Sequence, residues 1–141
     1  MPALSRWMLL LSFFYLFCGS TLGALLLTQQ AGFSLSGIEK QLALLATLHP
    51  LWLLVGWVAQ CVLGMAYWIF PRVQKHQRPR TILAVCSCLF LNLGLFLYSF
   101  FFFFFPSSSF LTLSAILLFL SFPLMFLHLQ PRIKGFGSPS A

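Results

Sequence analysis

The residues best suited to chemistry lie along one predicted helix that follows His49. An apolar run from about residue 50 to residue 70 is interrupted by glycines and by Gln60, which a helix dissolved in lipid does not need. At about 100° per residue, the unusual positions fall within roughly 80° of one another and share one stripe. An imidazole can bind a metal, glycines admit a second helix or a flat ligand, and a glutamine in lipid should face the interior. The stripe consists of His49, Leu53, Gly56, Gln60, Gly64 and Tyr67.

The remaining inventory of reactive side chains excludes hydrolytic enzymes. Glu39 is the only acidic residue, so paired carboxylates, an acid–base triad and a two-metal site are all absent from the sequence. Cys86 and Cys88 are two residues apart, so on a helix they point in nearly opposite directions and cannot bind one metal together. The sequence therefore predicts no catalytic residues, although it does not decide whether a cofactor is bound.

The elements that position the stripe are predicted by composition and hydropathy. Of the 141 residues, 60% are hydrophobic and only 6% are charged, which is not the balance of a water-soluble domain. Each apolar run has about 20–25 residues, enough to cross a hydrocarbon core of roughly 30 Å as a helix. We expect an all-α integral membrane protein, a single transmembrane domain of residues 1–141 that forms an up-down bundle of four helices. The expected helices cover about residues 7–27, 50–70, 81–105 and 110–129.

The basic residues predict the orientation of this bundle. The net charge is +7, and with four crossings Arg6, the 71–80 loop and the 131–141 tail share one side of the membrane. Seven of the eight basic residues lie on that side, so the positive-inside rule places both termini in the cytoplasm. The topology explains the charge, so we expect contact with the lipid bilayer and no nucleic-acid partner. A bacterial inner membrane is the expected location.

The first outer loop is the longest connection and has helical character. Ser36 and Glu39 have the spacing of a capping box, and leucines follow on one face. We expect a short interfacial helix there, ending before Pro50 opens the second span, because proline is tolerated in a first helical turn.

Other spans offer packing partners for the stripe. Asn92 and Ser99 lie seven residues apart on one face of the third span and could hydrogen-bond Gln60. Gly19 and Gly23 are four residues apart on the first span, a close-packing signature. One interpretation is therefore helix packing through Gly19, Gly23, Gly56, Gly64 and Asn92. The other is a ligand site that begins at His49.

The second span also resembles a known family. Its sequence "HPLWLLVGWVAQCVLGMAYWIFPR" resembles small stand-alone four-helix membrane proteins related to subunit I of haem-copper oxidases, especially the C-family. Asn92 and Gly94 in "LNLGLFL" and the tail "LQPRIKG" add to the resemblance, which covers most of the chain. The residues that carry it in the second span are His49, Gly56, Trp57, Gln60, Gly64, Tyr67, Trp68, Phe70, Pro71 and Arg72.

The resemblance implies a haem b site. In that family a histidine on the matching helix binds the low-spin haem near the outer face, so His49 becomes a candidate axial ligand, with Gly56 and Gln60 as candidate lining. The chain departs from the family by having Leu51 where a second histidine often stands, and it lacks the copper-site histidines. His128 is expected near the inner end of the fourth span, too far from His49 to bind the same iron.

Three functions remain open. The first is an accessory subunit of a respiratory or photosynthetic electron-transfer complex, without a copper site, in a larger membrane assembly or a homo-oligomer. The second is a b-type haem protein for redox chemistry or gas sensing through His49. The third and weakest is a small transporter, because Gln60 and Asn92 are the only polar side chains expected at depth.

Overall fold

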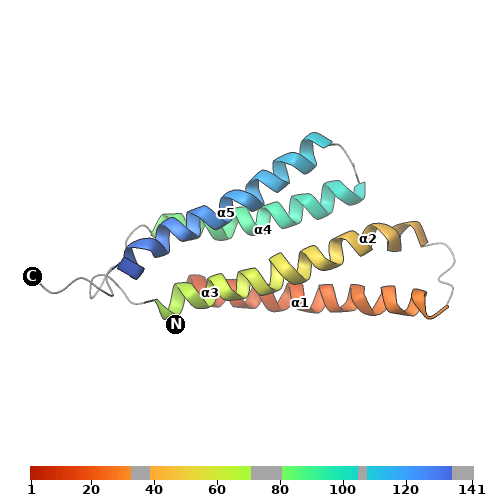
Figure 1. Ribbon diagram of the computed structural model, residues 1–141, viewed down its shortest axis with the longest axis horizontal. Coiled ribbons are helices and arrows are strands. Elements are labelled where there is room, and N and C mark those ends of the chain that lie inside the picture. The colour runs from red at the N-terminus through yellow and green to blue at the C-terminus, as the bar shows by residue number, and fades with distance from the viewer. Residues whose placement is uncertain (33–38, 71–80, 105–107, 135–141) are drawn as a thin grey trace, which may run out of the picture.

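The described chain forms two helical hairpins that lie side by side. The computed structural model describes residues 1–32, 39–70, 81–104 and 108–134, and these ranges contain helices and no strand. α1 (Ala3–Gln30) pairs with α2 (Glu39–Leu51), η1 (Trp52–Ala59) and α3 (Gln60–Ile69), and α4 (Thr81–Phe104) pairs with α5 (Ser108–Lys134). The N-terminus and the end of α5 lie at the same end of the molecule (Figure 1). The predicted all-helical fold is therefore confirmed.

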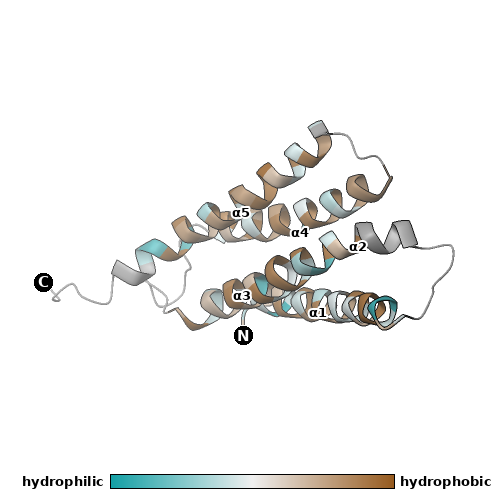
Figure 2. Ribbon diagram, turned by 45° about the vertical axis from the view of Figure 1, so that its right-hand side comes forward, coloured by the Kyte–Doolittle hydropathy of each residue, from teal (hydrophilic) through white to brown (hydrophobic). Residues whose placement is uncertain are grey.

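Four long helices in the described ranges can cross a membrane. Each carries an apolar window of at least 18 residues with few charges, and the segments are Ala3–Gln30, Leu45–Ile69, Thr81–Phe104 and Ser109–Pro131. Hydrophobic residues predominate on all of them (Figure 2). Large apolar side chains such as Phe17 and Phe119, which are 72% and 73% exposed, cover the exterior, as expected for helices that face lipid.

The second span starts earlier than the sequence predicts. α2 begins at Glu39 and passes through Pro50 without ending, so Pro50 lies inside the helix rather than in its first turn. The expected separate interfacial helix is therefore replaced, from Glu39 onward, by the start of one continuous helix. Ser36, the other half of the predicted capping box, falls outside the described residues, as does the 71–80 loop.

A π-helical segment, η1, occupies the middle of this span. Pro50 has no N–H for the carbonyl of Ala46, and its ring crowds that carbonyl, which disturbs the α-helical hydrogen-bond ladder. The π-helix begins two residues later, at Trp52, and at its end the N–H of Gln60 reaches the carbonyl of Val55, five residues back. Such segments are rare and tend to mark functional or tightly packed positions.

Small residues allow α4 and α5 to pack closely against each other. A Cβ placed on Gly94 would lie 2.9 Å from Leu118 Cγ and 3.1 Å from the Leu118 backbone nitrogen, so glycine brings the two helices close together. The Ser87 hydroxyl donates to the Ser121 carbonyl over 2.6 Å and joins the helices across the same interface. These contacts give the hairpin the small-residue packing typical of membrane helices.

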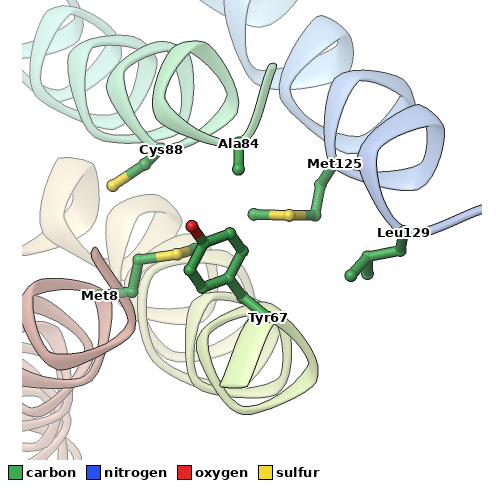
Figure 3. Packing of buried hydrophobic residues seen from close by; sticks show 6 residues of the cluster. All are labelled: Met8, Tyr67, Ala84, Cys88, Met125 and Leu129. Atoms are coloured by element: carbon green, nitrogen blue, oxygen red, sulfur yellow. The ribbon is translucent and has the colours of Figure 1, made fainter. Parts of the chain in front are cut away.

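The two hairpins meet in a buried cluster near the N-terminal end of α1. Residues from four helices contribute, and the Tyr67 ring lies among sulfur-bearing side chains (Figure 3). Sulfur atoms pack favourably against aromatic rings, and Met8 and Met125 are both fully buried there. The cluster consists of Met8, Tyr67, Ala84, Cys88, Met125 and Leu129.

Candidate functional site

His49 is held in a fixed orientation by α1. Its Nδ1 lies 2.8 Å from the carbonyl oxygen of Gly19. A carbonyl only accepts, so Nδ1 carries the proton, and in the neutral ring Nε2 is left with a lone pair. A Cβ on Gly23 would lie 2.7 Å from Cε1 of the ring, so glycine at that position makes room for the imidazole.

The contacts of His49 belong to a longer seam between α1 and the second span. In the half nearer the C-terminus of α1, side chains of the second span pack against α1 glycines: His49 lies over Gly23, and a Cβ on Gly19 would lie 2.6 Å from Leu53 Cδ2. Here α1 supplies the small residues and the second span the large ones. His49 and Leu53, the first two residues of the predicted stripe, therefore pack closely against α1.

In the half of the seam nearer the N-terminus of α1, the second span supplies the small residues. A Cβ on Gly56 would lie 2.6 Å from Tyr15 Cγ, and one on Gly64 would lie 3.1 Å from Met8 Cβ. Here the large side chains come from α1. The predicted stripe is therefore an antiparallel packing surface, in which α1 supplies the small residues along one half and the second span supplies them along the other.

Tyr15 changes the role expected for Gly56. The space in front of this glycine, which a flat cofactor was expected to use, is filled by the Tyr15 ring. Tyr15 also packs edge-on against Trp52, with ring centroids 6.5 Å apart. Sequence reasoning missed Tyr15, because it sits within an aromatic and leucine-rich run where nothing distinguishes it from lipid-facing neighbours.

Gln60 faces the interior but does not find the expected partner. It is 0% exposed, and neither its Nε2 nor its Oε1 has a hydrogen-bond partner. Asn92 instead donates to the Cys88 carbonyl in its own helix over 2.8 Å, and its Oδ1 is also buried without a partner. The expected Gln60–Asn92 hydrogen bond is therefore not formed, and both amides retain unused capacity.

Ser99, the other expected partner of Gln60, bonds elsewhere. Trp52 Nε1 donates to Ser99 Oγ over 2.9 Å, and Ser99 Oγ donates to the Leu95 carbonyl over 2.8 Å. The bond from Trp52 joins η1 to α4 and so links the two hairpins at a point far from the buried cluster that contains Tyr67. Gln60 lies between these two connections along the second span.

An open groove lies beside His49 on the C-terminal half of α1. Its volume is about 590 Å³, and His49 is half-buried at its wall. Gly56 and Gln60, the expected cofactor-lining residues, do not line it. The lining residues are Ser20, Gly23, Ala24, Leu26, Leu27, Gln30, His49 and Leu53.

The other described histidine is remote from this groove. His128 is 0% exposed and stacks on Tyr67 of the buried cluster between the two hairpins, with ring centroids 5.2 Å apart. Tyr67 follows His49 by 18 positions on one continuous helix, which corresponds to roughly 25 Å. His49 and His128 therefore do not face a common atom. Within the described ranges, no three His, Cys, Asp or Glu residues gather as a metal site.

No family model, curated protein or solved structure matches the chain. The resemblance to haem-copper oxidases therefore stays a prediction.

Proposed function

We propose that the chain is an accessory membrane subunit of a respiratory or photosynthetic electron-transfer complex, with an oxidase-subunit-I-like arrangement that lacks the copper site. The observation that carries the proposal is the distribution of side chains on the long helices. Large apolar side chains such as Phe13, Phe17 and Phe119 are exposed, while the buried serines bond backbone carbonyls. Such a surface can pack against apolar helices of a partner as readily as against lipid.

The proposed location is a bacterial inner membrane with both termini in the cytoplasm. Seven of eight basic residues flank the same side of a four-crossing chain, which supports this orientation. A reporter fused at the C-terminus, or inserted after Gln77, is expected to be cytoplasmic, and one inserted after Ser34 is expected outside. An outward C-terminus would contradict the proposed even number of crossings.

A second candidate function, b-type haem binding, is favoured by the orientation of His49. Metal-bound histidines commonly donate their other ring N–H to a carbonyl, as Nδ1 does here to Gly19. The ring therefore fits an axial ligand through Nε2, and a bound haem would supply one-electron transfer or gas binding. Among the described residues, His128 lies too far from His49 to hold the same haem, so we expect a partner chain to supply any second ligand.

One purification tests both candidates. A photo-crosslinking amino acid at Phe17 or Phe119 is expected to capture a subunit of a redox complex from native membranes, because one of these exposed faces meets the partner. The same amino acid at Met125, which is 0% exposed, is the control and should crosslink only within the chain. The captured complex is then examined by a reduced-minus-oxidised absorbance spectrum, in wild type and in His49→Ala.

The outcomes separate the two candidates. Capture of a redox subunit with unchanged absorbance in His49→Ala supports the accessory role alone. The matched control is His76→Ala, the same change at a histidine of the 71–80 loop. Loss of a b-type absorbance in His49→Ala, but not in His76→Ala, supports haem binding. If a scan of the exposed positions on all four helices captures only lipid, the accessory role is wrong.

A further inference from the structure

The groove beside His49 has the size and lining of a small-molecule site. Its volume of about 590 Å³ lies within the range of roughly 300–1,000 Å³ that ligand sites occupy. Leucines, alanine and glycine form most of the wall, and the few polar side chains are Ser20, Gln30 and His49. An apolar wall with a few polar groups is the usual composition of a site that binds and orients one ligand.

The groove is open toward the membrane. Ser20, Ala24 and Leu27 are exposed on the C-terminal half of α1, and Leu27 is 66% exposed. The segment of α1 that carries them lies within an apolar helix long enough to cross the bilayer. A molecule dissolved in the lipid can therefore enter from the side, without any opening of the bundle.

His49 gives the groove a defined chemical preference. Since Nδ1 donates to the Gly19 carbonyl, the neutral ring presents Nε2 as an acceptor, and no described residue donates to it. The ring cannot turn freely, because it lies against Gly23. The wall of the groove is mostly apolar and its described residues offer this nitrogen no donor, so an occupant with an O–H group gains a hydrogen bond that an occupant without one lacks.

We propose that this groove binds a lipid-soluble molecule through a hydroxyl group that donates to Nε2 of His49. Two sources have this chemistry: a hydroquinone ring and the free hydroxyl of a glycerolipid. The site does not depend on the accessory role proposed above. It competes with haem for the same nitrogen, because Nε2 can either accept an O–H proton or bind iron.

Paired probes test the proposal on the full chain in lipid nanodiscs. Photoreactive forms of an alkyl hydroquinone and of diacylglycerol are each compared with their O-methyl ethers, which keep the shape but lose the O–H donor. A hydrogen bond of about 1 kcal/mol corresponds to roughly fivefold in affinity, so one hydroxyl probe should bind about fivefold more tightly than its ether. Labelling should map to peptides containing residues 20–30 or 49–53.

Variants assign the preference to His49. His49→Phe keeps a flat ring but removes the acceptor, so the difference between hydroxyl and ether should disappear. Phe17→Ala, on an exposed position of α1 outside the groove, should leave it unchanged. His49→Gln restores an acceptor and should recover part of the preference.

The result also identifies the ligand source. A preference shown only by the hydroquinone or only by diacylglycerol supports the proposal and names the source. Equal binding of both hydroxyl probes and their ethers in wild type overturns it, and this comparison needs no variant to fold. Labelling outside the groove overturns it as well, and so does purified protein whose His49 nitrogen is already bound to stoichiometric haem.

Discussion

Gly56→Leu is expected to destabilise the bundle more than any other single change in the α1 seam. A Cβ at this position would lie 2.6 Å from Cγ and 2.8 Å from Cβ of Tyr15, which are the root of that side chain and not its flexible end. The larger leucine must push α1 away from η1 or rotate Tyr15 out of its contact with Trp52. Overpacking of this kind typically costs about 1–3 kcal/mol, which should appear as a lower unfolding temperature in detergent.

Two comparisons make this result specific. Val58→Leu adds bulk at an exposed position of the same π-helix and should change the unfolding temperature little. Tyr15→Ala should relieve part of the Gly56→Leu penalty, because it empties the space that leucine needs, and a double-mutant cycle measures that coupling. Gly64→Ala should be milder than Gly56→Ala, since its Cβ would meet Met8 Cβ at 3.1 Å. If Gly56→Leu unfolds like wild type, α1 and η1 do not pack against each other as described.

Hydropathy and the 3.6-residue helical period predict much of this fold, because both can be evaluated for one helix without knowing its neighbours. Apolar length alone located the four long helices, since backbone hydrogen bonds in lipid leave few alternatives to helix. The 3.6-residue period placed Gly56, Gln60, Gly64 and Tyr67 on one face, and all four are buried. The period does not predict which residues of a neighbouring helix these four contact, because that depends on which helix is the neighbour and on its register.

The features that sequence reasoning missed depend on contacts between helices or on a local defect. Pro50 is the only residue near Trp52 that indicates a disturbed helix. From the sequence alone, proline at this position predicts the start of a helix instead. The filling of Gly56 by Tyr15 and the bond from Trp52 to Ser99 depend on which helices become neighbours. The seven-residue spacing of Asn92 and Ser99 predicted that both would hydrogen-bond Gln60. Instead, each side chain donates to a carbonyl of its own helix, and neither bonds Gln60.

The residues of the groove beside His49 could be identified from the sequence, but their contact with one another could not. Gly19 and Gly23 were identified by their four-residue spacing, and His49 by its position before an apolar run. Their meeting requires α1 and α2 to align antiparallel, so that the Gly19 carbonyl faces Nδ1. The sequence therefore supplied the parts of the site, and the tertiary contact defined which ring nitrogen is available.

Gln60→Met is expected to stabilise the protein, which is the opposite of what removal of a buried polar side chain usually does. Gln60 is 0% exposed, and both of its amide atoms lack a hydrogen-bond partner. Mutational data place the cost of burying such an amide at about 1–3 kcal/mol. Methionine keeps the unbranched length of glutamine and its flexibility, so the core loses the desolvation penalty without gaining a large cavity. The free energy of unfolding should therefore rise by about 1–3 kcal/mol.

A satisfied polar group provides the control, because its loss should act in the other direction. Ser87→Ala removes the 2.6 Å bond to the Ser121 carbonyl and should lower the free energy of unfolding by about 0.5–1.5 kcal/mol. Thermal or denaturant unfolding in one detergent compares both variants with wild type. If Gln60→Met is the less stable protein, its amide is bonded in the membrane, and Asn92 Oδ1 or a buried water becomes its partner. If Gln60→Met is the more stable protein, the unpaired amide of Gln60 weakens the bundle. Its presence then points to a role for Gln60 other than stability.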